Sequence, residues 1–295
     1  MEKYSVLMTV YTKDNPEYFS LALDSMVNQT YKPDEIVLVK DGPVIEELQK
    51  VIDDHIAADA PIVQVQLPKN KGLGLALNEG IKVIKNELIA RMDSDDFSLP
   101  ERCELQAKEF EKNPQLDIIG CPVLEFVGTI DNIVGERKVP LTNEEIYKFA
   151  KKRDPFNHPT VMYRKSAVEA AGCYSDYRKN QDTDLWIKML SNGVTCMNLA
   201  DPVFRFRFDE GTYKKRKSWI NTKILIEIRY KAWKSGFNSF GEFLMVATAQ
   251  LGMYVLPVGF QKFLYQKFLR RQIVDQEGKM KQLIKTRNHR GGMKS

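Results

Sequence analysis

The sequence predicts an α/β fold with a mainly parallel sheet flanked by helices, followed by a helical C-terminal extension. Short apolar, β-branched runs alternate with longer amphipathic runs through residues 1–115, which is typical of right-handed βαβ units. An acidic cluster, Asp93-Ser94-Asp95-Asp96, follows directly after one of the apolar runs. Parallel sheets bind ligands beyond the carboxyl ends of their strands, so the fold class also predicts where the site lies.

The first half of the chain supplies most of the expected sheet, in apolar runs of the kind that form buried parallel strands. Strands are expected over residues 5–11, 34–39, 62–67 and 87–90. Helices are expected between them, from Pro16 to Thr30, over residues 44–58 and from Leu75 to Ile84. Pro16 suits the first turn of a helix, and Asp41-Gly42-Pro43 is a stop signal after the second strand. Consecutive strands are therefore expected to be joined by crossover helices.

The second part of the chain, residues 117–208, continues the α/β pattern with fewer signals. We expect strands over residues 117–127 and 161–163, and a helix from Asp182 to Ser191. The carboxyl ends of the first-half strands place Asp41, Lys71 and the acidic cluster at one edge of the sheet. These residues are therefore expected to form one site.

The last third differs from both earlier parts. Residues 219–233 follow the pattern of an amphipathic helix, and residues 243–260 are strongly apolar over about 18 residues, the short limit for crossing a bilayer. Residues 261–271 mix basic and bulky apolar side chains, which suits a helix lying in a membrane interface. A buried helical hairpin packed on the domain is the alternative. Residues 287–295 are expected to be a disordered tail.

Composition bounds the class of protein and its partners. The chain has 295 residues, 43% hydrophobic and 28% charged, which is ordinary for a globular protein and argues against wholesale disorder. The net charge of +5 is uneven, with a basic run at residues 214–217 and more basic residues through the last third. This asymmetry favours a polyanionic or membrane-surface partner. No arginine-rich arm, zinc-ligand spacing or aromatic RNA-binding motif is present, so we expect no nucleic-acid partner.

The cysteines and the first residues indicate the compartment. The 4 cysteines are scattered without a Cys-x-x-Cys pair, and Met1-Glu2-Lys3-Tyr4 begins no apolar signal segment. We therefore expect no structural disulfides and a cytoplasmic protein. The histidines at positions 55, 158 and 289 are too far apart in sequence to suggest a metal cage, so any metal is expected on carboxylates.

The acidic cluster has a chemical interpretation and an ordinary one. Crowded carboxylates repel one another, and hard divalent cations such as Mg²⁺ and Mn²⁺ relieve this because they prefer oxygen ligands and keep positions open for substrate phosphates. Asp93 and Asp95 after a strand therefore indicate a site for a metal and a diphosphate. A solvated acidic turn or a helix N-cap is the alternative, since Asp is common in both.

Several motifs in this order resemble family 2 glycosyltransferases of the GT-A fold, the inverting class that uses nucleotide sugars. The resemblance covers about residues 4–210. The matching segments are Thr9-Val10-Tyr11, Lys40-Asp41-Gly42, Asn70-Lys71-Gly72 through Asn78-Glu79-Gly80, Asp93-Ser94-Asp95-Asp96 with Pro100 and Arg102, Asn157-His158-Pro159-Thr160 through Gly172-Cys173-Tyr174, and Gln181-Asp182-Thr183-Asp184-Leu185-Trp186. The sequence departs from the family pattern at Lys40, where Asp or Asn is common, and at Gln181, where Glu is common.

The resemblance assigns roles to residues of this chain. It implies that Asp182 is the catalytic base and that Asp93 and Asp95 hold Mn²⁺ or Mg²⁺. The implied donor contacts are made by Thr9, Tyr11, Asp41, Lys71, Asn78, Asp93 and Asp96. Residue type alone leaves ordinary roles open: an Asx turn for Asp41, a solvated side chain for Lys71 and a helix N-cap for Asp182. A structural role for His158 is at least as well supported as an acceptor contact.

The resemblance also predicts a function, with rivals. We expect an inverting, metal-dependent transferase that moves a sugar from a nucleotide sugar, UDP-linked by preference, to a hydroxyl of a glycan. Residues 1–210 would form the catalytic domain, with a nucleotide-sugar half over 1–115 and an acceptor half over 116–210, and residues 211–295 a membrane-associating extension. The acceptor is expected to be lipid-linked, at the inner face of the cytoplasmic membrane, in surface-polysaccharide synthesis. A sugar-phosphate nucleotidyltransferase or a non-catalytic membrane scaffold is the alternative, but Thr12-Lys13-Asp14-Asn15 has no glycine for a nucleotidyltransferase loop.

Overall fold

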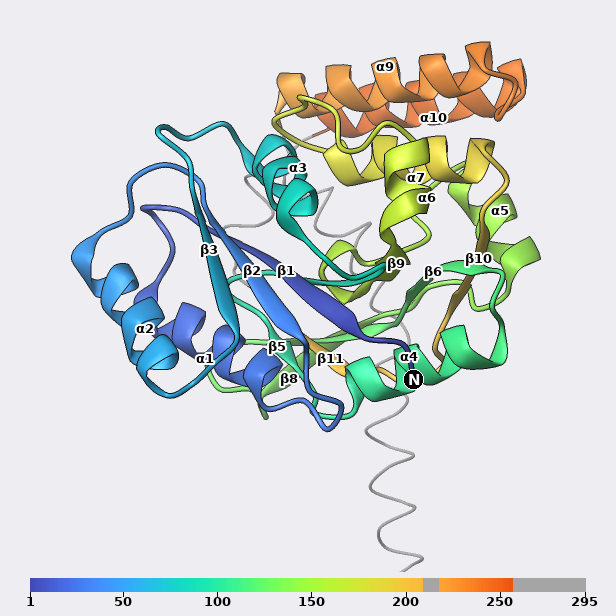
Figure 1. Ribbon diagram of the computed structural model, residues 1–295. Coiled ribbons are helices and arrows are strands. Elements are labelled where there is room, and N and C mark those ends of the chain that lie inside the picture. The colour runs from blue at the N-terminus through green and yellow to red at the C-terminus, as the bar shows by residue number, and fades with distance from the viewer. Residues whose placement is uncertain (209–217, 257–295) are drawn as a thin grey trace, which may run out of the picture.

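The computed structural model describes residues 1–208 and 218–256 and has a layered α/β architecture (Figure 1). A 7-stranded sheet has the order β10-β6-β9-β4-β1-β2-β3. Its strands are β1 (Tyr4–Val10), β2 (Glu35–Lys40), β3 (Ile62–Gln66), β4 (Leu88–Met92), β6 (Leu116–Gly120), β9 (Met162–Arg164) and β10 (Thr195–Asn198). Neighbouring strands are parallel except β9, which runs antiparallel to β4 and β6. The predicted mainly parallel sheet is confirmed.

Helices cover both faces of this sheet, as Figure 1 shows. They are α1 (Pro16–Val27), α2 (Glu46–Ala57), α3 (Leu73–Val83), α4 (Arg102–Lys112), α5 (Asn143–Ala150), α6 (Lys165–Ala170) and α7 (Gln181–Ser191), with the 3-10 turn η1 (His158–Thr160). Alternate side chains of each strand point to opposite faces. Val6 and Met8 therefore join the core under α1 and α4, whereas Leu7 joins the core under α3 and α7. Both faces of the sheet are buried, which explains why its strands read as nearly continuous apolar runs.

A second, 4-stranded sheet was not predicted. It has the order β5-β11-β7-β8, from β5 (Phe97–Ser98), β7 (Val123–Phe126), β8 (Ile133–Arg137) and β11 (Phe204–Arg207). The single strand expected over residues 117–127 is wrong, because the chain leaves the large sheet after β6 and joins the small sheet as β7. Pro122 lies at the break and has no N–H to give to a ladder. The apolar pattern continues across the break because both segments are buried.

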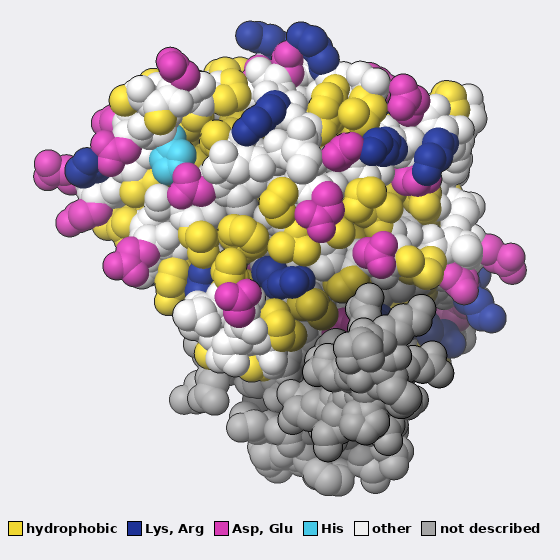
Figure 2. Space-filling view, turned by 90° about the horizontal axis from the view of Figure 1, so that it is seen from below, with side chains coloured by type: hydrophobic (Ala, Val, Ile, Leu, Met, Phe, Trp, Pro, Cys, Tyr) yellow, Lys and Arg dark blue, Asp and Glu magenta, His cyan; other side chains and the backbone are white. Residues whose placement is uncertain are grey.

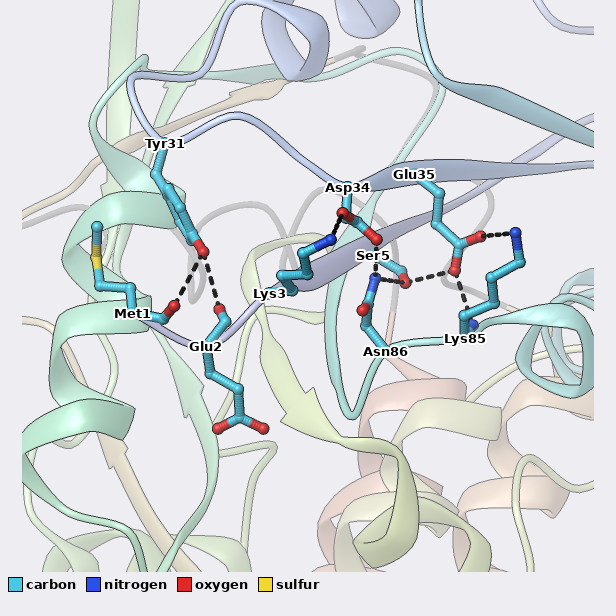
Figure 3. Close-up of polar contacts among 9 residues, drawn as sticks. All are labelled: Met1, Glu2, Lys3, Ser5, Tyr31, Asp34, Glu35, Lys85 and Asn86. Atoms are coloured by element: carbon cyan, nitrogen blue, oxygen red, sulfur yellow. Dashed lines mark hydrogen bonds and ion pairs between the residues drawn. The ribbon is translucent and has the colours of Figure 1, made fainter.

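The amino ends of the parallel strands are joined by a closed polar network (Figure 3). Glu35 at the start of β2 accepts hydrogen bonds from Ser5 Oγ at 2.7 Å and from the backbone N–H of Lys85 at 2.8 Å. Asn86, just before β4, donates to Ser5 Oγ and to Asp34. Asp34 is also paired with Lys3 Nζ at 2.6 Å. The second oxygen of Glu35 has no hydrogen bond among the described residues, but Lys85 Nζ lies 4.0 Å from it, so both carboxylates here have a cation nearby.

The C-terminal part is helical over its described residues, as expected. Helices α9 (Trp219–Lys234) and α10 (Phe240–Val255) pack on each other beyond α7 (Figure 1). Ser239 and Glu242 form a capping box that starts α10, and Trp233 stacks on Phe243 with ring centroids 5.7 Å apart. Buried Ile228 attaches α9 to Ile187 of α7. None of the helices over residues 1–208 and 218–256 is long and apolar enough to cross a membrane. The predicted interfacial segment 261–271 and the basic run 214–217 lie outside the described residues.

Candidate functional site

The residues predicted to act together come from the carboxyl ends of β1, β2 and β4 and from the start of α7. Asp41 follows β2 and Asp93 follows β4, on parallel strands joined through β1. The start of α7 packs closely on α3 at Gly74, where a Cβ atom would lie 3.2 Å from Cγ of Gln181, the first residue of α7. The charge on Asp93 affects the pKa of Asp182, so the two carboxylates share one site.

Asp41 organises the loop that precedes α3. Its carboxylate accepts hydrogen bonds from the backbone N–H of Lys71 at 2.6 Å and of Gly72 at 3.0 Å, and from Asn70 Nδ2 at 2.8 Å. Gly42 adopts φ +91°, and a Cβ atom there would lie 2.8 Å from the backbone nitrogen of Asn70. A carboxylate offers about four lone-pair sites, so these bonds leave room for a ligand donor. The structure shows Asp41 as the anchor of this loop, and its contact with a nucleobase stays a prediction.

Two other predicted donor contacts are engaged within the protein. Lys71 Nζ lies 3.1 Å from Glu79 Oε1, an ion pair between one residue of the loop and one of α3. The side chain of Asn78 donates to the carbonyl of Tyr174 at 2.8 Å and accepts from its N–H at 3.0 Å. Asn78 therefore ties α3 to the segment that leads into α7. Donor contacts by either residue stay predictions.

The acidic cluster after β4 is short of positive charge. Asp96 is buried; its Oδ1 accepts from the backbone N–H of Arg207 at 2.7 Å, and its Oδ2 has no hydrogen-bond partner among the described residues. Burial, then the charges of Asp95 and Asp93, raises the pKa of Asp96 well above its usual value. Desolvation, then the charge of Asp93, raises the pKa of Asp95 to about 6. Mutual repulsion of this kind is what a bound cation relieves.

Asp14, in the loop after β1, extends this cluster and was not predicted. Its Oδ2 accepts from Ser94 Oγ at 2.9 Å and from the backbone N–H of Tyr11 at 3.1 Å. Burial raises the pKa of Asp14 to about 6, with smaller contributions from Asp95 and Asp93. Tyr11 is thereby held beside the cluster, whereas Thr9, on β1, is half-buried at the end of the strand. Its position in the loop after the first expected strand could have identified Asp14 from the sequence.

The donor set of the site fits Mn²⁺ or Mg²⁺. No group of three or more His, Cys, Asp or Glu side chains in the part of the chain described by the structure is arranged to enclose a metal by itself. Magnesium-type sites need no such cage, since one or two carboxylates with waters and substrate phosphates complete the coordination. Asp93 and Asp95 could provide those carboxylates, and one oxygen of Asp96 has no hydrogen-bond partner among the described residues.

Asp182 is a half-buried carboxylate in the first turn of α7, two residues after the N-cap Asn180. It is therefore not the N-cap, the alternative that its residue type left open. Burial and the charge of Asp154 raise the pKa of Asp182 to about 7, while backbone hydrogen bonds at the helix start lower it. A pKa near the working pH suits a general base.

His158 lies beneath the site as part of a buried polar group. Its Nε2 lies 2.9 Å from the hydroxyl of Tyr174, and its ring packs edge-on against Trp186. Burial, followed by the positive charge of Arg91, lowers the pKa of His158 well below its usual value. The ring is therefore neutral at pH 7. Its buried partners favour the structural role over the acceptor contact.

Arg207, on β11, is a further site residue that sequence reasoning missed. Its guanidinium lies 3.7 Å from the ring centroid of Tyr18 and its Nε donates to the carbonyl of Asp95 at 2.7 Å. Its charge lowers the pKa of Asp95. The small second sheet thus places a cation against the acidic cluster. The sequence carried no signal for it, because the pairing of β11 with β7 and β5 is non-local.

Comparisons with known proteins agree with this geometry. The family model for glycosyl transferase family 2 matches residues 5–172. An uncharacterized glycosyltransferase of Haemophilus influenzae is 39% identical over 91% of this chain and 100% of its own length. The amylovoran biosynthesis glycosyltransferase AmsE of Erwinia amylovora is 37% identical over 90% of this chain and 98% of its own. The Escherichia coli UDP-Gal:alpha-D-GlcNAc-diphosphoundecaprenol beta-1,3-galactosyltransferase is 34% identical, with 91% and 97% covered.

Solved structures share the fold at low sequence identity. Staphylococcus aureus TarS 1–349 in complex with UDP-GlcNAc aligns with a TM-score of 0.60 and 18% identity, over 92% of this chain and 74% of the other. The mannosyltransferase PcManGT of Pyrobaculum calidifontis, in complex with GDP-Man and Mn²⁺, aligns with a TM-score of 0.58 and 15% identity, over 92% and 81%. The expected GT-A fold is confirmed. With the family model matching more than half of it, the chain belongs to glycosyltransferase family 2 and is a glycosyltransferase.

Proposed function

We propose that this enzyme transfers a sugar from a nucleotide sugar, UDP-linked by preference, to a glycan hydroxyl by a single inverting displacement that requires Mn²⁺ or Mg²⁺. The observation that carries the proposal is the pairing of a carboxylate of pKa about 7, Asp182, with an acidic cluster short of positive charge. One group removes a proton and the other holds a cation. Inversion needs no more than one carboxylate to act as base, because the reaction is one displacement.

The proton transfer, the cation and the nucleoside are each assigned to different residues. Asp182 takes the proton of the acceptor hydroxyl while that oxygen attacks the anomeric carbon from the side opposite the nucleotide. Asp93 and Asp95 would hold the cation, which when bound stabilises negative charge on the departing nucleotide. The loop anchored by Asp41 lies at the neighbouring strand end, where the nucleoside would bind.

The relatives support a nucleotide-sugar donor and a lipid-linked acceptor. The Escherichia coli relative is named for UDP-Gal and a diphosphoundecaprenol acceptor, and AmsE for amylovoran biosynthesis. The TarS and PcManGT structures hold UDP-GlcNAc, and GDP-Man with Mn²⁺. We infer that the acceptor of this enzyme is a lipid-linked glycan and that the product is a surface polysaccharide. The donor sugar is left to experiment, because epimers differ by a single hydroxyl.

A donor screen with a metal-site variant tests the catalytic proposal. Each nucleotide sugar is incubated with the purified protein in Mn²⁺ or in EDTA, and donor hydrolysis and UDP binding by calorimetry are measured. We expect one UDP-sugar to be hydrolysed by the wild-type protein when Mn²⁺ is present and not when EDTA is present. We expect Asp95→Ala to lose metal-stimulated UDP binding while its melting temperature stays unchanged. A scaffold would bind the donor without hydrolysing it. Unchanged metal-dependent affinity in Asp95→Ala would overturn the metal assignment.

The helical hairpin formed by α9 and α10 has an exposed apolar face, which supports attachment to the inner face of the cytoplasmic membrane. Leu244, Leu251 and Val255 recur at the helical spacing of one face of α10 and are 48%, 42% and 78% exposed. Trp219 and Ile220 of α9 are also exposed. By contrast, Figure 2, seen from the side away from the hairpin, shows charged and hydrophobic side chains interspersed. An exposed apolar stripe on a helix, with basic residues nearby, suits contact with an anionic bilayer.

Vesicle co-sedimentation tests the membrane attachment. We expect full-length protein to bind vesicles containing anionic lipid, and the variant with Leu244, Leu251 and Val255 changed to Ser to bind several-fold less, because it loses apolar contact area. The matched control changes the exposed Ile45, Ile56 and Val83 to Ser, away from the hairpin. Truncation after Ser239 should release the protein while UDP binding survives. Full-length protein that ignores anionic vesicles at physiological salt would refute the attachment.

A further inference from the structure

Arg91 occupies a position where an apolar side chain is expected. It lies on β4 between Ala90 and Met92, pairs with Leu7 of β1, and is 0% exposed. The neighbouring buried positions of this parallel strand are apolar or small, as usual for a strand covered on both faces. Burying a guanidinium costs several kcal/mol unless its charge and its N–H donors are compensated. The residue therefore needs an explanation from its contacts.

Arg91 contacts Asp93, one of the two proposed metal ligands. Arg91 Nη2 lies 2.5 Å from Asp93 Oδ1, the ion pair that compensates the buried charge. None of the three side-chain nitrogens of Arg91, Nε, Nη1 and Nη2, has a hydrogen-bond partner among residues 1–208 and 218–256, so the contact with Asp93 is an ion pair. The charge of Arg91 acts on the buried polar group beneath the site, Tyr163, Tyr174 and His158. It also acts to lower the pKa values of Asp95 and Asp96, whereas Asp93 is the carboxylate that forms a direct ion pair with it.

A second buried arginine shows what a purely architectural role looks like here. Arg102 is also 0% exposed, but its Nη1 donates to the carbonyl of Arg91 at 3.0 Å and to that of Pro159 at 2.9 Å. Arg102 thus joins β4 to the 3-10 turn through backbone acceptors. Arg91 has no such backbone bond among the described residues and reaches a single carboxylate at the site.

We propose that Arg91 is a positioning residue for metal binding: it fixes one oxygen of Asp93 so that the other faces the cation. The proposal rests on the proposed metal-dependent function. Hydrogen-bonded partners that orient metal ligands typically contribute 10–100-fold to metal affinity. Because Arg91 and Asp93 are separated by one residue at the end of β4, the strand itself sets the direction of the carboxylate. Arg91 itself is 0% exposed, so the proposed role is exerted through Asp93.

Binding of Mn²⁺ with UDP to folded variants tests this role without relying on turnover. Arg91→Met keeps an unbranched side chain in the buried position and removes the charge. We expect about 10-fold or more weaker binding of Mn²⁺ with UDP by calorimetry, with a changed Mn²⁺ paramagnetic resonance spectrum. Arg91→Lys should recover part of the affinity. Arg91→Gln gives a second neutral variant should the Met variant fail to fold. Arg164→Met is the matched control, since Arg164 lies at the other end of the sheet and donates to the carbonyl of Leu116.

A double-mutant cycle separates positioning from general damage. In an Asp93→Asn background, Arg91→Met should weaken Mn²⁺ binding no further, because the oriented charge is already gone. A purely structural arginine would lower the melting temperature and leave Mn²⁺ affinity unchanged at a temperature where the protein is folded, and that result overturns the inference. If wild-type protein binds UDP without any metal dependence, the proposed function fails first. The two failures are therefore distinguishable.

Discussion

The two ends of the large parallel sheet treat charge in opposite ways. At the amino ends, Asp34 and one oxygen of Glu35 accept hydrogen bonds from Lys3, Ser5 and the residues before β4, and the other Glu35 oxygen lies 4.0 Å from the cation of Lys85 (Figure 3). At the carboxyl ends, burial raises the pKa values of Asp95 and Asp96, and the charge of Asp93 raises both further. The same strands thus begin in a neutral network and end in an excess of negative charge.

This difference separates residues that stabilise the fold from residues kept for a ligand. A charge with its partners inside the protein contributes to folding, and the protein needs nothing more from it. Carboxylates that repel one another cost stability, which a cation and a diphosphate group offset when they bind. Arg91 and Arg207 supply positive charge at the carboxyl ends, but Asp96 Oδ2 stays unpartnered among the described residues.

The largest effect on the rate of transfer is expected from a substitution of Asp182, the proposed base at the carboxyl ends of the strands. Asp182→Asn keeps the shape of the side chain and removes its basicity, so the rate of transfer should fall about 10²-fold or more, with UDP affinity little changed. Single-turnover measurements with the donor identified by the screen check this. Near-normal turnover in the variant would show that another group takes the proton.

The matched control for that experiment makes the same chemical change at the opposite end of the sheet. Glu35 is 4% exposed and accepts from Ser5 and Lys85. Glu35→Gln should lower the free energy of unfolding by about 1–2 kcal/mol, because its amide is a weaker acceptor here, and leave the rate of transfer unchanged for folded protein. A slower Glu35→Gln enzyme would show that the two ends are coupled, against the comparison.

The sequence predicted the parts of the site that follow from strand ends. The alternation of apolar runs located β1, β2 and β4, and residues just after two of these strands, Asp41 and Asp93, lie at the predicted edge. Asp182 came from the resemblance, since its residue type alone suited an N-cap equally well. The structure assigns the N-cap to Asn180 instead.

What the sequence could not predict depends on non-local pairing. The second sheet brings Arg207 against Asp95 across more than a hundred residues of chain, and neither strand alone indicates its partner. Arg91 lies two residues before the recognised acidic motif, but nothing in one sequence says which side chain of a strand is buried with a charge. The contact of Asn78 with Tyr174 is also non-local, since 96 positions separate the two residues.

A smaller effect is expected from pH, and it acts at one end of the sheet alone. Since burial and Asp154 raise the pKa of Asp182 to about 7, the base is increasingly protonated below that pH. Transfer should therefore decrease by up to about tenfold per pH unit as the pH falls below about 7. A cation bound at Asp93, as proposed, would favour the charged form of Asp182, so the inflection of the metal-loaded enzyme should lie at or below 7.

The decrease of kcat at acidic pH can be assigned to Asp182 once the other causes of lost activity in acid are removed. The pKa values of Asp14 and Asp95 are about 6, so acid also weakens the metal site, and kcat is measured from pH 5.5 to 8.5 at saturating Mn²⁺ and donor. The residual kcat of Asp182→Asn should no longer decrease as the pH falls below 7, whereas the kcat of Glu35→Gln should still decrease. Because the folded-state pKa of Asp182 is raised, its contribution to folding is present in acid and lost as the pH rises through about 7. Activity and stability should therefore change in opposite directions across this window, and a rate that is flat below pH 7 at saturation would rule out a base with this pKa.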